Sequence, residues 1–192
     1  MTARVKPGPD ARERILEAAD RLFYRDGLRA AGIDAVVAEA GVAKMTLYAH
    51  FKSKDDLIAA YLRRRDERLR AWFADAIDRH AAATGDRLAA IFAALREWFA
   101  SPDFRGCAFI NATAELPDPA HPGRAAVADH KRQFTALIAD ALRKARVRDP
   151  DSAAGAVVLL IDGAIVAAAR DGTPAAADAA LAAARTLVGR GG

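Results

Sequence analysis

The spacing of apolar residues constrains the fold of this chain more than any other feature of its sequence. Near the N-terminus, apolar side chains recur at the three- and four-residue intervals of one helical face; they are Ile15, Ala18, Ala19, Leu22 and Phe23. The same period can be followed through most of the 192 residues, whereas runs of β-branched residues, which favour strands, are few. The pattern predicts an all-α protein of about nine helices.

Short polar residues, glycines and prolines mark where these helices should begin and end. Asp10 is placed to cap the first helix through its carboxylate, and Gly27 is placed to end it. Ser53 is a similar cap for a long fourth helix. We expect helices at about residues 10–26, 33–40, 43–51, 53–82, 88–99, 107–116, 125–146, 152–170 and 174–188.

A tight turn joins the second and third predicted helices. Gly41 permits a sharp change of direction, and Val42 is expected to fill the corner. Leu47 and Phe51 lie four residues apart, so they should face inward together. The outer side of the third helix then presents Lys44, Met45, Tyr48 and Ala49, with Thr46 and His50 on its flank. Two short helices joined in this way form a helix-turn-helix.

The basic charge of the chain is concentrated near this motif. The whole chain has a net charge of +4. Residues 1–54 contain ten Lys and Arg against seven Asp and Glu, a net of +3, whereas residues 55–192 have a net of +1. A basic N-terminal module suits a polyanionic partner.

The segment from residue 33 to residue 57 resembles the DNA-binding signature of the TetR (tetracycline repressor) family. The matching parts are the Ala-Gly-Val turn at residues 40–42, the Thr-Leu-Tyr-x-His-Phe sequence at residues 46–51 and the Lys-x-x-Leu sequence at residues 54–57. They agree in order and spacing without gaps. The resemblance covers residues 10–60, and the rest of the chain is similar to the family only in its helical layout.

The resemblance implies two domains and a role in transcription. Residues 1–54 would form a three-helix, helix-turn-helix DNA-binding domain, with a disordered arm at residues 1–9. Residues 55–192 would form a helical domain for effector binding and dimerisation. Such a protein is usually a repressor that a small molecule releases from a palindromic operator, and activation remains the alternative.

The resemblance also assigns roles to the third helix. Lys44, Met45 and Tyr48 would face the bases of the major groove, where a lysine donates to guanine and a methionine contacts the methyl group of thymine. The residues expected to position phosphates are Thr46, His50 and Lys54. Taken singly, each of these residues is more often a structural or solvated side chain than a DNA contact, whereas the whole set at this spacing favours DNA contact.

One departure from the family pattern concerns the start of the second helix. Ala31 and Gly32 stand where the family usually has hydroxyl residues that cap this helix and touch phosphate. Backbone N–H groups at a helix N-terminus bind anions without a hydroxyl. A phosphate would therefore be held there by the backbone alone, or the affinity would be lower.

The second domain is rich in large apolar residues, which are candidates for either core or ligand pocket. By resemblance, its fourth to seventh helices would enclose a ligand cavity, and apolar walls with few polar groups are typical of such a cavity. The residues expected to line it are Trp72, Phe73, Phe92, Cys107, Asn111, Glu115, His130 and Phe134.

Three of these residues form a possible polar stripe. Cys107, Asn111 and Glu115 follow one another at four-residue intervals on an otherwise apolar predicted helix. A buried polar group without a partner costs about 1–3 kcal/mol, so these groups should be hydrogen-bonded. Either the chain satisfies them, with His130 and Arg132 as candidates, or a ligand or water does.

The alanine-rich helices after residue 150 suit close packing between helices. By resemblance, residues 152–188 would form a four-helix bundle with their copies in a two-fold homodimer. The two recognition helices would then contact half-sites about one DNA turn, ~34–36 Å, apart. A ligand beside the fourth helix would shift it and change that separation.

Composition excludes several other classes of protein. A single cysteine rules out an internal disulfide, and with only four histidines we expect no metal site and no cofactor. No uninterrupted apolar run reaches the ~18 residues of a membrane span, since Gly155, Asp162 and Gly163 interrupt the longest candidate. The sequence therefore predicts a cytoplasmic protein.

Two other functions remain as alternatives. An enzyme with Cys107 as nucleophile would need a nearby base, for which His130 is the candidate, but no nucleophile elbow, phosphate loop or metal-ligand spacing accompanies them. A redox-sensing Cys107 is a variant of this hypothesis. The second alternative is a helical interaction module without an effector, which a small-molecule effect on operator affinity would exclude.

Overall fold

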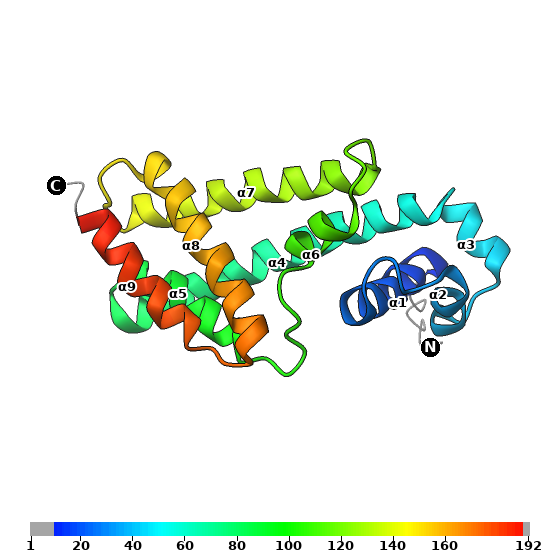
Figure 1. The fold of residues 1–192 in the computed structure, drawn as a ribbon, viewed down its shortest axis with the longest axis horizontal. Helices are drawn as coiled ribbons and strands as arrows, with labels where there is room; N and C mark the ends of the chain where they lie inside the picture. The colour runs from blue at the N-terminus through cyan, green and yellow to red at the C-terminus, as the bar shows by residue number, and fades with distance from the viewer. Residues whose placement is uncertain (1–9, 190–192) are drawn as a thin grey trace, which may run out of the picture. The chain divides into compact units, whose positions relative to one another are not determined.

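The computed structural model describes residues 10–189, and the arm expected at residues 1–9 lies outside them. The described residues form nine helices and no strand (Figure 1), so the predicted all-α fold is confirmed. The helices are α1 (Ala11–Asp26), α2 (Ile33–Ala40), α3 (Lys44–His50), α4 (Lys54–Thr84), α5 (Arg87–Phe99), α6 (Ala108–Glu115), α7 (Pro122–Lys144), α8 (Pro150–Asp171) and α9 (Ala176–Gly189).

The chain folds as two compact units. The N-terminal unit contains the residues up to Arg65 together with Ala112–Val127, and the C-terminal unit contains Asp66–Asn111 together with the residues from Ala128 onward. Three helices, α4, α6 and α7, therefore contribute residues to both units. The domain boundary expected after residue 54 stays a prediction.

The helix α1 supplies the core of the N-terminal unit. The carboxylate of Asp10 caps it by accepting a hydrogen bond from the N–H of Glu13 at 2.8 Å. Gly27 follows its last residue with a φ of +93°. The predicted apolar face is buried, and Leu16 is buried beside it. The cap, the end and the buried face of this helix agree with the sequence pattern.

Two consecutive residues of α4, Arg65 and Asp66, form ion pairs in different units. Arg65 pairs with Asp20 of α1 at 2.6 Å, and its guanidinium lies over the ring of Tyr24 at 3.6 Å. The next residue, Asp66, pairs with His130 of α7 at 2.7 Å. Arg65 belongs to the N-terminal unit and Asp66 to the C-terminal unit. The boundary between the units thus falls inside an unbroken helix.

Two helices begin earlier than the sequence pattern predicts, and each begins at a proline. α7 starts at Pro122 and α8 at Pro150, where the pattern predicts residues 125 and 152. Proline fits the first position of a helix because its ring fixes φ near the helical value and its missing N–H would have no helical partner there. Before α8, the carboxylate of Asp149 also accepts a hydrogen bond from the N–H of Ser152 at 3.3 Å.

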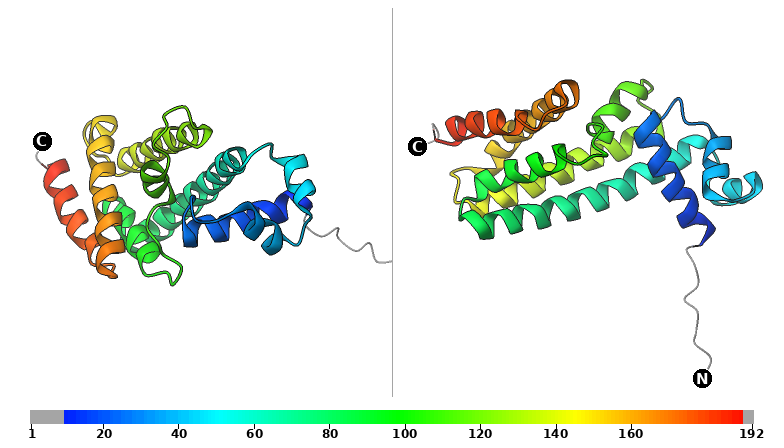
Figure 2. Two further views of the ribbon diagram at one scale, coloured as in Figure 1. Left: turned by 45° about the vertical axis from the view of Figure 1, so that its right-hand side comes forward. Right: turned by 90° about the horizontal axis from the view of Figure 1, so that it is seen from below.

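The C-terminal unit is organised around α5, α8 and α9. The helices α8 and α9 lie side by side (Figure 2), and α5 contacts both of them. The large side chains that are fully buried in this unit include Phe73, Ile77, Phe92, Ile91, Leu95 and Ile138. The core of the unit is therefore aromatic and branched aliphatic, as the helical pattern predicts.

The helix α8 is unusually apolar for its length. By length and composition alone it could cross a membrane, with a mean hydropathy of 2.0 over an 18-residue window of which 39% is buried. Asp162 and the two glycines interrupt the apolar run, as expected, but not the helix itself, and a core helix of a soluble protein passes the same test of length and composition. Part of its apolar surface is exposed, with Leu159 at 73% and Val166 at 51%.

Candidate nucleic-acid interface and interior polar site

Gly41 makes the turn between α2 and α3 possible. Its φ of +62° and ψ of +42° lie in the left-handed region, which strains a residue that carries a Cβ. The N–H of Gly41 donates to the carbonyl of Ala38, and the N–H of Val42 donates to the carbonyl of Val37, each at 3.2 Å. These bonds satisfy carbonyls at the end of α2. The helix-turn-helix predicted from the sequence is formed.

The helix α3 has one buried side and one exposed side. Leu47 is fully buried, and Phe51, just after the helix, is 4% exposed. By contrast, Met45 is 85% exposed and Tyr48 is 45% exposed. Large apolar side chains gathered on an exposed helix face are typical of a binding surface.

Lys44, at the start of the exposed side, pairs with an acidic residue of α2. Its Nζ lies 2.8 Å from the carboxylate of Asp34, and both side chains are exposed. The hydrogen bond to Asp34 raises the pKa of Lys44, so this amine is charged near neutral pH. Exposed ion pairs are weak in salt. The amine can therefore exchange Asp34 for another acceptor.

The residues expected to position phosphates have different surroundings. His50 is exposed and Thr46 is half-buried. The Nζ of Lys54 donates to the carbonyl of Arg29 at 3.2 Å and lies 6.0 Å from the ring centre of Phe23. Lys54 thus ties the first residue of α4 to the loop between α1 and α2. A phosphate contact by these residues stays a prediction.

The helix α2 begins without a side-chain cap. Gly32 holds the cap position in an extended conformation, and no side chain hydrogen-bonds to the helix from there. This absence follows from the departure noted at Ala31 and Gly32. Free N–H groups and the positive end of the helix dipole favour an anion at such a place.

Glu115 ends α6 and binds the loop between α1 and α2. Its Oε2 accepts a hydrogen bond from the N–H of Arg29 at 2.9 Å, and the Nε of Arg29 donates to the carbonyl of Glu115 at 3.1 Å. A Cβ at Gly27 would lie 3.1 Å from the same Oε2. The structure therefore places Glu115 on this loop, within the N-terminal unit, and its ligand contact stays a prediction.

Cys107 and Asn111 do not share a buried stripe with Glu115. Cys107 is buried and precedes α6, whereas Asn111 is exposed and Glu115 is half-buried. The side-chain amide of Asn111 donates to the carbonyl of Arg105 at 3.2 Å. The partners of Asn111 and Glu115 thus come from the chain itself, but neither is His130 or Arg132.

The chemistry of Cys107 does not favour catalysis. Burial raises the pKa of its thiol, so the thiolate needed for nucleophilic attack is scarce near neutral pH. Among residues 10–189, no three His, Cys, Asp or Glu side chains come together in a group suited to a metal ion.

A buried polar group connects α4 with α7 through His130, which the sequence singled out, and Asp66, which it did not. Asp66 is 5% exposed and His130 is 3% exposed, and Nδ1 of His130 lies 2.7 Å from Oδ1 of Asp66. Arg70 donates to both carboxylate oxygens of Asp66 at 2.9 Å. Burial alone would raise the pKa of Asp66, but the hydrogen bonds from Arg70 and His130 outweigh it and lower that pKa. Burial lowers the pKa of His130, and Asp66 offsets this only in part.

Asp66 could not be identified from the sequence because it lies in a strongly charged stretch. Residues 63–70 read Arg-Arg-Arg-Asp-Glu-Arg-Leu-Arg, and in such a stretch a buried carboxylate cannot be told from an exposed one. The available signal is the four-residue interval between Asp66 and Arg70 on the predicted helix.

His130 lies among aromatic rings of the C-terminal unit. Its ring stacks on Phe109 with 3.6 Å between ring centres and an interplanar angle of 9°, and Phe134 lies 5.6 Å away. Phe73 packs edge-on against Phe134 at 5.2 Å. The structure thus brings together three of the residues expected to bind ligand: Phe73, His130 and Phe134.

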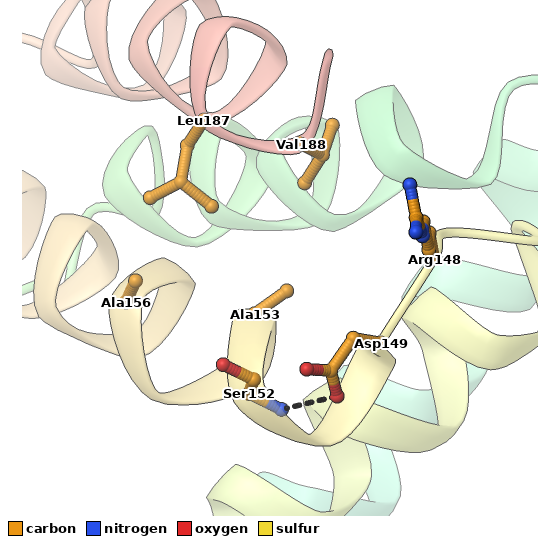
Figure 3. A pocket seen from close by; sticks show the side chains of 7 residues that line it. All are labelled: Arg148, Asp149, Ser152, Ala153, Ala156, Leu187 and Val188. Atoms are coloured by element: carbon orange, nitrogen blue, oxygen red, sulfur yellow. Dashed lines mark hydrogen bonds between the residues drawn. The ribbon is translucent and has the colours of Figure 1, made fainter. Parts of the chain in front are cut away.

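Two pockets lie along α8 and α9. A pocket of about 340 Å³ (Figure 3) is bounded by Arg148, Asp149, Ser152, Ala153, Ala156, Leu187 and Val188. A shallow groove of about 570 Å³ is lined mainly by small side chains such as Gly163, Ala167, Ala176 and Ala183, together with the larger Leu159. Neither contains a residue expected to bind ligand; of those residues, Phe92 is buried and Trp72 is half-buried.

Two family models match this chain. Residues 15–61 match the model described as bacterial regulatory proteins, tetR family, and residues 84–184 match the tetracyclin repressor-like C-terminal domain. The first match includes the helix-turn-helix, and the second extends from the end of α4 into α9.

Curated relatives include regulators that align over very different lengths. The HTH-type transcriptional regulator LmrA of Bacillus subtilis is 27% identical over 174 residues, which cover 86% of this chain and 90% of LmrA. The HTH-type transcriptional activator FasR of Mycolicibacterium smegmatis is 41% identical over 63 residues, which cover 33% of this chain and 29% of FasR. The match to FasR therefore spans less than a third of that protein.

Solved structures of similar proteins extend over nearly the whole chain. SCO4454, a TetR-family transcriptional regulator from Streptomyces coelicolor, is 37% identical, with a TM-score of 0.79 over 93% of this chain and 94% of that one. The reduced form of NemR from E. coli is 23% identical, with a TM-score of 0.80 over 93% of this chain and 97% of that one. The likeness to NemR concerns the fold alone.

Proposed function

Because this chain belongs to the TetR family of bacterial regulatory proteins, we propose that it is a cytoplasmic, ligand-responsive repressor that leaves a palindromic operator when a small molecule binds. The chain is a DNA-binding transcriptional regulator and not an enzyme. The observation that carries the proposal is the exposed side of α3, from which Met45 and Tyr48 project while Leu47 anchors the helix.

We propose that α3 enters the major groove. Lys44, Met45 and Tyr48 contact bases, because a major groove admits a helix and offers distinct donors, acceptors and methyl groups at each base pair. The side chains that position phosphates are Thr46, His50 and Lys54. The exposed ion pair between Lys44 and Asp34 supports this role, because breaking it costs little free energy when the amine binds a guanine instead.

We propose that two copies pair through α8 and α9. The shallow groove between these helices and the exposed Leu159 and Val166 support this interface, because small side chains let helices approach closely and large apolar ones lose contact with water. The expected interface covers residues 152–188. A two-fold dimer presents both recognition helices to a palindrome.

We propose that α6 carries the ligand signal to the DNA-binding unit. Its first residues belong to the C-terminal unit and its last residues to the N-terminal unit. At its end, Glu115 accepts a hydrogen bond from the N–H of Arg29, and the carbonyl of Arg29 accepts another from Lys54. A shift of α6 would thus disturb the loop before α2 directly.

Lys44→Ala is expected to weaken binding to the operator by about 5- to 150-fold, which corresponds to the ~1–3 kcal/mol of a contact between a side chain and a base edge. Fluorescence anisotropy with labelled DNA from the chain's own promoter, at fixed salt, measures this affinity. Binding to an unrelated duplex should change much less, so specificity falls.

Lys144→Ala is the matched control for Lys44→Ala. Lys144 is an exposed lysine of α7 that also pairs with an aspartate, Asp140. The substitution removes the same charge away from the proposed interface, and operator affinity should stay within about twofold. If both variants lost operator affinity equally, Lys44 would contribute only its positive charge and no specific contact. An unchanged operator affinity in Lys44→Ala would contradict a contact between Lys44 and a base.

Glu115→Ala is expected to weaken operator binding by about tenfold. The substitution removes the carboxylate that accepts a hydrogen bond from the N–H of Arg29, and hydrogen bonds to charged groups contribute about 1.5–3 kcal/mol. Part of that energy holds the loop before α2 in its DNA-binding geometry. Hydrogen exchange of the Arg29 amide should accelerate in parallel.

Two further variants identify the cause of the Glu115→Ala effect. Glu115→Gln keeps an acceptor oxygen, so it should retain most of the affinity. Glu97→Ala removes a carboxylate that pairs with Arg79 and His80 in the C-terminal unit, and it should leave operator binding unchanged. Normal operator affinity in Glu115→Ala despite faster exchange at Arg29 would rule out the proposed path of the signal.

A further inference from the structure

Two exposed arginines of α1, Arg12 and Arg14, carry positive charge that no carboxylate compensates. Neither forms an ion pair with any acidic residue among residues 10–189. Glu13, which lies between them in the chain, is already paired with Arg64 of α4. Other arginines of the same unit are paired as well: Arg21 with Glu39, Arg25 with Asp26 and Arg65 with Asp20. The charge of Arg12 and Arg14 is therefore available to a polyanion.

Each of these arginines is held beside one end of α3. The guanidinium of Arg12 lies over the ring of Phe51, which directly follows α3, at 5.5 Å from the ring centre. Nη1 of Arg14 donates to the carbonyl of Gly41, in the turn before α3, at 3.4 Å. An aromatic ring and a carbonyl orient a guanidinium without cancelling its charge. The remaining N–H groups of each guanidinium can still donate to another acceptor.

The short length of α3 brings both of its ends near the borders of a major groove. A helix of seven residues is about 10 Å long, and the major groove of DNA is about 12 Å wide. When α3 lies in the groove, the cations beside its two ends are therefore close to the phosphates that border it. Arginine suits this acceptor, because its planar guanidinium donates parallel hydrogen bonds to phosphate oxygens.

We propose that Arg12 and Arg14 bind operator phosphates at the two ends of α3, so that α1 contributes directly to DNA binding. Phosphate contacts fix the register and orientation of a protein on DNA but do not read its sequence. The inference rests on the proposed entry of α3 into the major groove, and it adds a second helix to the DNA-binding surface.

The salt dependence of DNA binding tests this role. Each phosphate contact releases counterions, so loss of one contact lowers the slope of log K against log salt concentration by about 0.9. Arg12→Gln and Arg14→Gln should each produce this decrease for every copy of the chain on the DNA. At about 0.1 M salt, the loss corresponds to about eightfold weaker binding per contact. An unrelated duplex should lose affinity by a similar factor, because phosphates are common to all sequences.

Arg63→Gln is the matched control. Arg63 is an exposed arginine of α4 in the same unit, and it also lacks a carboxylate partner among the described residues. It lies about 2.5 helical turns beyond Lys54, the first residue of α4. Its substitution removes the same charge away from α3 and should leave the slope unchanged. A decrease equal to that of Arg12→Gln and Arg14→Gln would overturn the proposal.

Lysine variants separate a phosphate contact from a purely structural role. Arg12→Lys and Arg14→Lys keep the charge, so each should retain most of the native slope. A native slope in Arg12→Gln or Arg14→Gln overturns the assignment of that arginine, even if the operator affinity falls. Fluorescence anisotropy between about 50 and about 300 mM salt measures affinity and slope together.

Lys44→Ala distinguishes this inference from the proposed function. If Arg12→Gln and Arg14→Gln lower the slope while Lys44→Ala keeps the native operator affinity, the phosphate contacts are supported and base contact by α3 is contradicted. If Lys44→Ala weakens operator binding while both glutamine variants keep the native slope, base contact is supported and the inference is overturned.

Discussion

Leu159→Glu is expected to separate the proposed dimer into monomers and to weaken operator binding by at least about 100-fold. Leu159 is 73% exposed in one chain, and Val166, seven residues further on the same side of α8, is 51% exposed. Burial of a leucine stabilises an interface by about 1.5–3 kcal/mol, and two-fold symmetry repeats each contact. Glutamate removes this gain and brings two like charges toward the symmetry axis.

Loss of the dimer affects DNA binding because the second half-site is bound with the help of the first. In a dimer, the second contact forms at a high effective concentration, and the gain in affinity reaches 10²- to 10⁴-fold. Monomers lose this gain although each α3 is intact. Analytical ultracentrifugation and anisotropy on full and half operators measure both effects.

The control for Leu159→Glu adds the same charge outside the proposed interface. Ala82→Glu changes an exposed residue of α4 and should leave both dimer and operator affinity unchanged. Because Leu159 is exposed in the single chain, Leu159→Glu should also keep its helical circular dichroism. A stable dimer of the Leu159→Glu variant would place the interface elsewhere.

Asp66→Ala is expected to lower the free energy of unfolding by about 3 kcal/mol. Removing one member of a buried ion pair costs about 3–5 kcal/mol, because the other members stay buried without compensation. We expect the lower end of this energy range because the side chain of Arg70 is 25% exposed and can be hydrated. For a chain of this length, each kcal/mol lowers Tm by about 2–4 °C, so thermal unfolding should occur ~6–12 °C lower.

A second pair on the same helix provides the control for Asp66→Ala. Asp75 and Arg79 are also four residues apart on α4, with the same 2.9 Å contact, but their side chains are 69% and 50% exposed. Asp75→Ala should therefore cost less than about 0.5 kcal/mol. Equal losses at both positions would mean that burial does not set the energy of the Asp66 group.

The order and nature of the helices could be predicted because their signals are local. Asp10 and Ser53 cap helices through hydrogen bonds at 2.8 Å and 3.0 Å, as their positions before apolar repeats predict. Gly41 adopts the left-handed conformation that a tight turn requires. The exposed side of α3 follows from the same periodicity once Leu47 is placed inward. These features depend on neighbours within a few residues.

Contacts between distant segments could not be predicted from this sequence. Glu115 binds Arg29, which is 86 positions away, and Asp66 binds His130, which is 64 positions away. The expected stripe fails at Asn111, which is exposed although its N–H bonds the carbonyl of the buried Cys107 in helical register. Spacing places residues near one side of a helix, but the packing of distant segments decides whether that side is buried.

The missing side-chain cap at the start of α2 affects how the DNA-binding surface of the protein can be mapped. Gly32 contributes no side chain at the cap position, so a phosphate bound there is held by main-chain groups. Alanine scanning leaves the main chain in place, so it would show no loss of operator affinity at the start of α2. Substituting single phosphates of the operator by uncharged methylphosphonates probes the same contact from the DNA side.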